Sequence, residues 1–191
     1  MELKGSKTEH VLLAAFAGES QARTRYTFFA SAARKEGFRQ IADIFEETAR
    51  NEKEHAELFF NHLQGGEVEI TAAYPAGVVG TTAENLLAAA EGEKLEWGTL
   101  YPDAAEIAKE EGFKEVANTF SQVAKVEAYH ESRYRKLLEN VKNGLVFKKP
   151  EKVAWKCDNC GNVMEDREEA PKVCPVCLHD QSYFELWCEN Y

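Results

Sequence analysis

Apolar residues recur at intervals of three and four along most of the first 143 positions, and this spacing predicts long amphipathic helices. Two capping-box patterns, Ser6–Glu9 and Thr81–Glu84, mark helix starts, because the hydroxyl and the acid three residues later satisfy free backbone N–H groups. Glycines at positions 37, 65, 112 and 144 mark the stops. The predicted helices cover about 6–36, 38–64, 81–112 and 113–143.

The connections between these segments indicate how the helices pack. Short turns at Gly37 and Gly112 join the first two and the last two helices into tight hairpins. Residues 65–81 form a long connection that contains Gly, Pro and alternating apolar residues. Two hairpins joined by one long crossover form the ferritin-like type of four-helix bundle. We therefore expect an all-α bundle of this type.

The two hairpins repeat each other at an offset of 75 residues. The turn Glu36-Gly37-Phe38 matches Glu111-Gly112-Phe113. Further matching pairs are Tyr26 and Tyr101, Phe45 and Phe120, Glu52 and Glu127, and His55 and His130. This pattern indicates a duplicated hairpin and predicts an approximate two-fold axis through the bundle.

The composition changes after residues 144–153. All 5 cysteines and several strand-like stretches lie beyond this point. A segment of about 37 residues needs a metal or another cross-link to form a stable core. We therefore divide the chain into a helical bundle over 1–146, a linker over 147–154 and a small β-rich metal domain over 155–191.

Each of the four apolar helix faces carries an acid near its midpoint. These acids are Glu19, Glu52, Glu93 and Glu127, and the second and fourth faces add His55 and His130 three residues after the acid. Burying one unpaired carboxylate costs several kcal/mol, and no Lys or Arg lies on these faces near the acids. Bound cations are therefore expected to supply the missing positive charge.

The kinds and number of donors indicate which metal binds. Residues at i and i+3 share one helix face, so each Glu-x-x-His is able to place an oxygen and a nitrogen on the same ion. Mixed oxygen and nitrogen donors favour iron or manganese over Mg²⁺ or Ca²⁺. With Glu96 included there are seven donors, which is more than one ion uses. We therefore predict two metal ions in the bundle.

The repeat is broken in the third predicted helix. The interval from the acid to the following tyrosine is seven residues in the first helix, from 19 to 26, and eight in the third, from 93 to 101. One extra residue inside a helix is commonly absorbed as a π-bulge. Such a bulge would turn Glu96 inward together with Glu93. The alternative is that Glu96 faces solvent and Trp97 packs instead.

The cysteines form two Cys-x-x-Cys knuckles separated by 13 residues. The four are Cys157, Cys160, Cys174 and Cys177. Four thiolates at this spacing make a tetrahedral site for zinc or for a single iron. Spacing alone favours a structural zinc ribbon, whereas a neighbouring redox-capable bundle favours iron, which transfers one electron at a time. Cys188 is left over, and we interpret it as a structural or incidental thiol.

Charge and composition exclude several classes of function. The net charge of −10 and the absence of a Lys/Arg-rich stretch argue against nucleic-acid binding, which depends on phosphate neutralisation. No apolar run approaches the ~18 residues of a membrane span, and residues 1–7 lack the apolar core of a secretory signal. We expect a cytoplasmic protein that binds neither nucleic acid nor membrane.

These motifs closely resemble those of the rubrerythrin family over essentially the whole chain. The family joins a ferritin-like di-iron bundle to a rubredoxin-like domain. The resemblance implies a di-iron site made by Glu19, Glu52, His55, Glu93, Glu96, Glu127 and His130, with Glu52 and Glu127 bridging, and one iron held by Cys157, Cys160, Cys174 and Cys177. The interval between the knuckles is shorter than in free rubredoxins, and Asn162 occupies a position that is often aromatic there. These departures concern the reduction potential and not the ligation.

The resemblance also implies an activity. Rubrerythrins act as peroxidases that reduce hydrogen peroxide to water in defence against oxidative stress. Electrons would come from a reductase or a small electron-transfer protein and pass through the rubredoxin-like iron, across a head-to-tail homodimer. One iron would exchange His55 for Glu96 on oxidation, because Fe³⁺ prefers an anionic oxygen. Tyr26 and Tyr101 are candidate catalytic hydrogen-bonding groups, with ordinary core aromatic residues as the alternative.

Three other functions use the same motifs. A ferroxidase or iron-handling protein would share the bundle but has no use for a rubredoxin-like tail. A non-enzymatic electron carrier would use the bundle as a structural metal module. A zinc-ribbon interaction protein would be colourless, whereas a rubredoxin-like ferric site is red.

Overall fold

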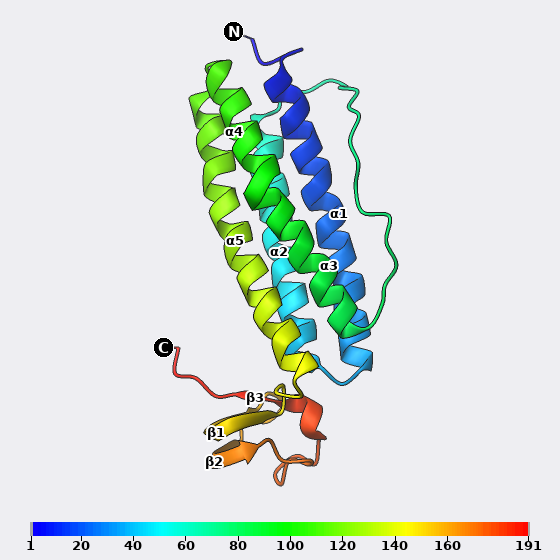
Figure 1. Cartoon of the computed structure of the whole chain (residues 1–191), viewed down its shortest axis with the longest axis vertical. Helices are drawn as coiled ribbons and strands as arrows, with labels where there is room; N and C mark the ends of the chain where they lie inside the picture. The colour runs from blue at the N-terminus through cyan, green and yellow to red at the C-terminus, as the bar shows by residue number, and fades with distance from the viewer. Residues whose placement is uncertain (1, 191) are drawn as a thin grey trace.

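Four long helical rods stand side by side, with a small sheet domain at one end (Figure 1). The structure is a computed structural model and describes residues 2–190. The rods are α1 (Lys7–Lys35), α2 (Arg39–His62), the continuous run of α3 (Thr82–Leu95), η1 (Glu96–Leu100) and α4 (Tyr101–Glu110), and α5 (Lys114–Lys142). The crossover between α2 and α3 passes along the outside of α1. The predicted bundle with one long crossover is confirmed.

Side-chain caps begin the first and third rods as the sequence predicts. The Thr81 hydroxyl accepts a hydrogen bond from the Glu84 N–H, and the Glu84 carboxylate accepts from the Thr81 N–H, so this capping box is complete. At α1 the Ser6 hydroxyl accepts from the Glu9 N–H. The Glu9 carboxylate, however, accepts from the N–H of Gly5 at 2.7 Å and not from that of Ser6. The return hydrogen bond of the α1 cap is therefore shifted by one residue from that of an ideal capping box.

The glutamates of the two repeated turns tie the hairpins together. Glu111 accepts hydrogen bonds at the start of α1 from the N–H groups of Lys7 (3.1 Å) and Thr8 (2.8 Å) and from the Thr8 hydroxyl (2.6 Å). Glu36 accepts from the N–H of Thr82 (2.9 Å) at the start of α3. Each turn thus satisfies free N–H groups of a helix in the other hairpin, which gives the repeated Glu-Gly-Phe turn a structural role.

Two apolar clusters fill the bundle on either side of its middle. One contains Leu12, Phe59, Tyr101, Val116, Phe120 and Val123 among others. The other contains Tyr26, Phe29, Ile41, Phe45, Leu86 and Tyr134 among others. The acids predicted at the helix midpoints lie between these clusters in sequence on every rod, so they occupy a polar layer within an otherwise dry core.

The C-terminal domain is a three-stranded antiparallel sheet with the order β2-β1-β3. The strands are β1 (Lys148–Cys157), β2 (Val163–Glu169) and β3 (Phe184–Leu186), and the 3₁₀ turn η2 (Gln181–Tyr183) precedes β3. Strand β1 begins inside the segment 147–154 that we expected to be a linker, and its first residue pairs with β2. The core is small and consists of Trp155, Cys157, Ala170, Cys174 and Phe184.

The C-terminal domain contacts the turn between α1 and α2. Phe38 and Phe147 stack with ring centroids 6.2 Å apart. The Arg39 guanidinium carbon lies 3.9 Å from the centre of the Tyr183 ring, which is a close cation–π contact. These contacts place the four cysteines beyond one end of the bundle and not beside its middle.

Replacing Glu111 by Ala tests the cap that links the hairpins. We expect the free energy of unfolding to fall by about 1–2 kcal/mol, the usual effect of losing a helix cap. The hydrogen bond from the Thr8 hydroxyl holds the pKa of Glu111 below its ordinary value of 4.5. The stabilisation is therefore complete above that ordinary value and disappears as the pH falls through the lowered pKa. Urea denaturation of both proteins across this pH range measures the effect.

Glu110→Ala is the matched control, because this neighbouring glutamate is exposed. We expect it to change the free energy of unfolding by no more than about 0.5 kcal/mol. Equal stability of the two variants would contradict the capping role of Glu111.

Candidate metal centres

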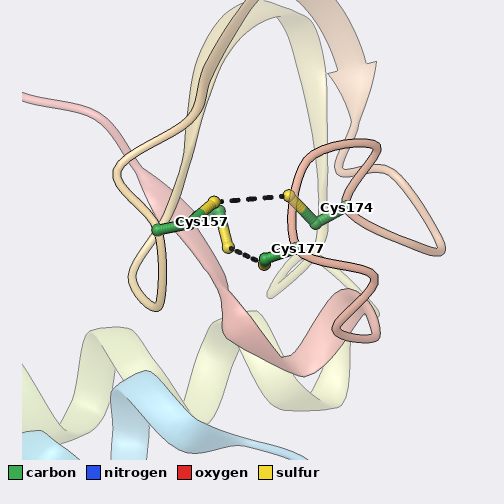
Figure 2. A group of neighbouring side chains, drawn as sticks. Cys157, Cys174 and Cys177 are labelled. Carbon is green, nitrogen blue, oxygen red and sulfur yellow. Dashed lines mark hydrogen bonds between the residues drawn. The ribbon is translucent and has the colours of Figure 1, made fainter.

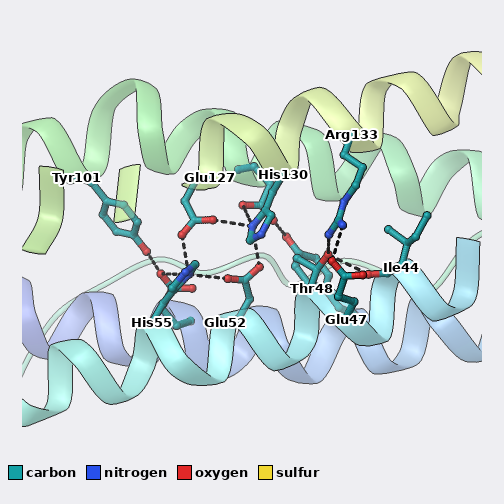
Figure 3. Close-up of polar contacts among 12 residues, drawn as sticks. Ile44, Glu47, Thr48, Glu52, His55, Tyr101, Glu127, His130 and Arg133 are labelled. Atoms are coloured by element: carbon teal, nitrogen blue, oxygen red, sulfur yellow. Dashed lines mark hydrogen bonds and ion pairs between the residues drawn. The ribbon is translucent and has the colours of Figure 1, made fainter. Parts of the chain in front are cut away.

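Six of the predicted ligands form one buried layer across the bundle. Their exposed fractions are 0% for Glu19, 1% for Glu52, 7% for His55, 1% for Glu93, 0% for Glu127 and 2% for His130. They come from α1, α2, α3 and α5, so every rod contributes at least one. Figure 3 shows Glu52 and His55 facing Glu127 and His130 from opposite rods.

The layer divides into two groups that share two acids. His55 Nδ1 lies 2.9 Å from Glu52 Oε2 and 2.8 Å from Glu127 Oε1. His130 Nδ1 lies 3.3 Å from Glu52 Oε1 and 2.8 Å from Glu127 Oε2. Each shared carboxylate therefore turns one oxygen towards each imidazole. Glu19 joins the first group and Glu93 joins the second, with all donor atoms of a group within 4.8 Å of one another.

Most of these donor atoms are buried without a hydrogen bond. Within residues 2–190, the atoms left without a partner include both oxygens of Glu52 and Glu127, one oxygen each of Glu19 and Glu93, and Nδ1 of both histidines. A polar cluster that served only the fold would have satisfied these groups. Ligand atoms around a shared ion lie close together in this way, without the geometry of hydrogen bonds to one another. The residues therefore fit two adjacent metal ions with four donors each.

Two phenols hold the acids that are not shared. The Tyr101 hydroxyl donates to Glu19 Oε1, and the Tyr26 hydroxyl donates to Glu93 Oε1. The pairing crosses between the hairpins, because each tyrosine contacts the acid of the opposite one. In both acids the other oxygen, Oε2, has no hydrogen bond among the described residues. Each phenol thus fixes the orientation of a donor whose second oxygen stays available.

The predicted π-bulge is confirmed, since η1 at Glu96–Leu100 is π-helical. The extra residue leaves Glu93 in the layer and places Glu96, half-buried, on the wall of a neighbouring cavity. Glu96 belongs to neither group of donors. Trp97 is also half-buried, and its Nε1 donates to Glu131 Oε2 at 2.7 Å. Six of the seven predicted bundle ligands thus converge, and ligation by Glu96 remains a prediction.

Without a metal the layer holds more acids than its histidines can balance. Burial and the charges of neighbouring carboxylates raise the pKa values of Glu19, Glu93 and Glu96 well above the ordinary value of 4.5. These acids therefore resist ionisation in the metal-free protein. Two divalent cations would remove this cost by supplying the positive charge that the helices lack.

The imidazoles titrate in the opposite direction. Burial lowers the pKa of each histidine, but contacts with Glu127 and Glu52 outweigh it and raise the pKa to about 9 for His55 and about 12 for His130. Burial raises the pKa of Glu127, but both histidines outweigh it and lower the pKa to about 2. Metal binding therefore has to displace protons from the two imidazoles.

The four cysteines of the knuckles converge in the C-terminal domain, and Figure 2 shows Cys157, Cys174 and Cys177 of this group. The sulfur atoms of Cys157 and Cys177 are 3.7 Å apart, and those of Cys160 and Cys174 are 3.6 Å apart. A disulfide would bring two sulfurs to about 2.05 Å. Four thiolates about 2.3 Å from a tetrahedral ion lie about 3.7–3.8 Å from one another, which matches the structure. Cys188 is exposed and outside this group.

Backbone groups and one amide surround these sulfurs. The backbone N–H of His179 is the main cause that lowers the pKa of Cys177 to about 6, which favours the thiolate. The amide of Asn162 donates to the Cys174 sulfur at 3.9 Å. Asn162, noted in the sequence as a polar residue at an often aromatic position, therefore contacts the metal site directly.

Fold and site together define a class of protein: a ferritin-like bundle with a carboxylate–histidine two-metal centre, joined to a four-cysteine rubredoxin-like domain. Two family models match the chain, rubrerythrin over residues 10–138 and the rubrerythrin rubredoxin-like domain over residues 155–185. The chain belongs to the rubrerythrin family. Its cofactors are accordingly a di-iron carboxylate–histidine site and one iron held by four cysteines.

Curated relatives and solved structures agree with this assignment. The rubrerythrin of Porphyromonas gingivalis is 61% identical, over 99% of this chain and 94% of that protein. The rubrerythrin of Clostridium perfringens is 55% identical, over 99% and 98%. The structure of mixed-valence nigerythrin is 29% identical and superposes with a TM-score of 0.63, over 96% of this chain and 87% of that one. Among residues 2–190 no helix is long and apolar enough to cross a membrane.

Sequence reasoning missed the contribution of the crossover. The Tyr74 hydroxyl donates to the backbone oxygen of Ala14 on α1 at 2.7 Å. Residues 72–75 thereby close one side of a cavity of about 460 Å³ beside the two-metal layer. The crossover sequence shows alternating apolar residues, but nothing in it identifies which helix they would cover.

Glu19→Gln tests whether the layer is built for cations. In the metal-free protein we expect the free energy of unfolding to rise by about 1–3 kcal/mol, because the amide removes the cost of burying or protonating this carboxyl group and its oxygen can still accept from Tyr101. In the iron-loaded protein the same change should lower the bound iron of the bundle. Chemical denaturation with and without chelator, together with metal analysis, measures both.

The exposed Glu110→Gln is the matched control and should change neither quantity. If Glu19→Gln destabilised the metal-free protein as much as the loaded one, the layer would be a structural polar cluster and not a metal site.

Proposed function

We propose that this protein reduces hydrogen peroxide to water at the two-metal layer, with electrons supplied through the four-cysteine iron. The observation that supports this most directly is the sharing of Glu52 and Glu127 between the two donor groups. Two Fe²⁺ ions held side by side by these residues would together supply the two electrons that breaking one O–O bond requires. Two protons complete the reaction, so that each peroxide yields two molecules of water.

The surroundings of the layer suit this reaction. The apolar clusters on either side keep bulk water from the centre, so that charges within it act at low dielectric. Glu96 lies on the cavity wall, and its charge is the strongest of those that raise the pKa of Glu19. We propose that Glu96 and His55 are alternative donors to the metal on the Glu19 side, and that Tyr26 and Tyr101 keep Glu93 and Glu19 oriented while this exchange occurs.

The position of the cysteine domain supports electron transfer between chains. This domain contacts Phe38 and Arg39 at the start of α2. Arg39 and Glu52 are 13 residues apart on α2, or about 20 Å along the helix axis. The four-cysteine iron is thus far from the bundle centre of its own chain. We therefore propose a head-to-tail homodimer in which each cysteine domain serves the partner's bundle.

The cysteine site also bears on the compartment in which the protein works. Because the knuckle cysteines lie at metal-ligand separations and not at disulfide separations, they suit a reducing compartment. We propose a cytoplasmic enzyme of oxidative-stress defence, reduced by a reductase or by a small electron-transfer protein.

The activity can be tested by mixing anaerobically reduced protein with hydrogen peroxide or with dioxygen. We expect hydrogen peroxide to oxidise the bundle iron at least about tenfold faster than dioxygen does, and Glu96→Ala to slow the peroxide reaction by about tenfold or more. Stopped-flow absorbance and a peroxide assay measure both. Glu106→Ala, an exposed acid on α4, is the control and should react like the wild type.

A preference for dioxygen with accumulation of ferric cores would replace this proposal with ferroxidase activity. Unchanged peroxide turnover in Glu96→Ala and in a His55→Ala variant would instead favour a plain electron carrier.

Mixed dimers test which chain supplies the electrons. A Cys174→Ser chain retains the bundle site but lacks the four-cysteine iron, and a Glu127→Ala chain has the opposite defect. Each alone should fail in donor-coupled turnover. Refolded together in equal amounts, they should recover about a quarter of wild-type turnover, since half of the dimers are mixed and each has one intact transfer pair.

Cys188→Ser is the matched control for the cysteine change and should keep both its red colour and its turnover. Failure of the mixture to recover any turnover, in samples shown to contain mixed dimers, would indicate transfer within one chain.

A further inference from the structure

The cavity beside the two-metal layer lies between α1, the α3–η1–α4 rod and the crossover. Its volume is about 460 Å³. Tyr74 and Pro75 form the outer wall, and the bond from the Tyr74 hydroxyl to Ala14 holds this wall against α1. The Tyr74 ring lies close to Gly18, because a Cβ at this position would be in ordinary van der Waals contact with the ring at 3.7 Å. The cavity is therefore bordered by all three elements and stays partly open to solvent.

One wall of the cavity borders the metal layer through Tyr101. Tyr101 lines the cavity, and its hydroxyl donates to Glu19. Glu96 lines it as well, and Gly18 lies directly before Glu19 in α1. A molecule in the cavity would thus lie next to the layer, with Tyr101 between it and Glu19.

The lining changes from polar to apolar along the cavity. At the Gly92 end it includes Gln21, Arg25 and Glu96, and Arg25 Nε donates to Gln21 Oε1 at 2.7 Å. Towards the start of α1 the lining becomes apolar, with Val11, Ala14, Ala15, Leu100, Ala104 and Phe120. Gly18 and Val11 are seven residues apart, so this apolar part extends about 10 Å along α1 from the metal layer.

Hydrogen peroxide alone does not require such a space. A water molecule occupies about 30 Å³ in the liquid, and peroxide is only slightly larger. Pockets for small organic molecules measure about 300–1,000 Å³ and are mostly apolar with a few placed polar groups. Both the volume and the lining of this cavity match that class, with the polar groups where the metal layer begins.

We infer that the cavity binds alkyl hydroperoxides, with the peroxy group at Glu96 and Tyr101 and the alkyl group along the apolar wall of α1 and α4. The inference rests on the proposed peroxidase function and extends its substrate class. The O–O bond of the hydroperoxide breaks, the oxygen on carbon leaves as an alcohol, and the other leaves as water. The two electrons come from the same reduced iron centres, and two protons come from solvent.

Turnover with three peroxides tests the inference. The probes are hydrogen peroxide, tert-butyl hydroperoxide and cumene hydroperoxide, assayed with the fully loaded protein. We expect the wild type to reduce all three. Ala14→Leu places extra volume on the apolar wall and should lower kcat/KM for cumene hydroperoxide by about tenfold or more relative to that for hydrogen peroxide, the usual effect of altered fit in an apolar pocket.

Ala17→Leu is the matched control. Ala17 is half-buried on the same helix, like Ala14, but does not line the cavity. This variant should keep the wild-type ratio between the substrates. Iron content and thermal denaturation of each variant confirm that it is folded, and Val11→Phe provides a second cavity-filling change at the far end of the apolar wall.

Binding of a product to protein that cannot turn over gives a measurement that is independent of peroxidase activity. Saturation-transfer NMR with the alcohol product 2-phenyl-2-propanol and zinc-loaded protein should show binding in the wild type and in Ala17→Leu, and loss of it in Ala14→Leu. If hydrogen peroxide is reduced but neither alkyl hydroperoxide is, the inference is wrong and the proposed function stands. If no peroxide is reduced, both are wrong. Equal effects of the two leucine variants would show that the cavity does not select the substrate, which also overturns the inference.

Discussion

The constraint on which the structure depends is an excess of negative charge inside a dry helical bundle. Four buried glutamates and two histidines form a layer between two apolar clusters, and most of their donor atoms have no hydrogen bond among residues 2–190. Carboxylates at such depth are stable only when cations neutralise them. The bundle thus supplies geometry and the iron supplies charge. The same low dielectric that makes the metal-free layer unfavourable strengthens every electrostatic interaction once the ions are bound.

The duplicated hairpin explains the near-symmetry of this layer, and departures from the duplication make its two sides different. Among residues 2–190 the π-helical turn η1 occurs only in the second hairpin, and it places Glu96 on the wall of the cavity. At the 75-residue offset Tyr134 replaces Phe59, and Arg133, whose guanidinium donates to the Thr48 hydroxyl, replaces Leu58. The crossover also closes a cavity whose lining includes Glu96 and Tyr101 of the second hairpin. We therefore place the proposed substrate binding and the proposed ligand exchange on the side of the layer that this cavity borders.

The two iron sites of one chain are held by different structural elements. The bundle site is held by four long helices, with the turn glutamates capping each other's hairpins. The cysteine site is held by two short knuckles on a three-stranded sheet with a five-residue buried core. So small a core depends on the metal for its stability. Contacts with Phe38 and Arg39 hold this domain at the end of the bundle.

The amino-acid sequence alone determined the four-helix bundle, the crossover, the paired Glu-x-x-His motifs, the π-bulge and the four-cysteine site, because each depends on local spacing along one helix or one knuckle. Only the tertiary structure decided how these parts meet. It showed that Tyr26 contacts Glu93 and Tyr101 contacts Glu19, that Glu96 lines a cavity and stays outside both donor groups, and that strand β1 begins inside the expected linker. Such relations depend on the rotation and depth of one helix against another and on where a long connection folds back. Periodicity within a single segment does not encode them.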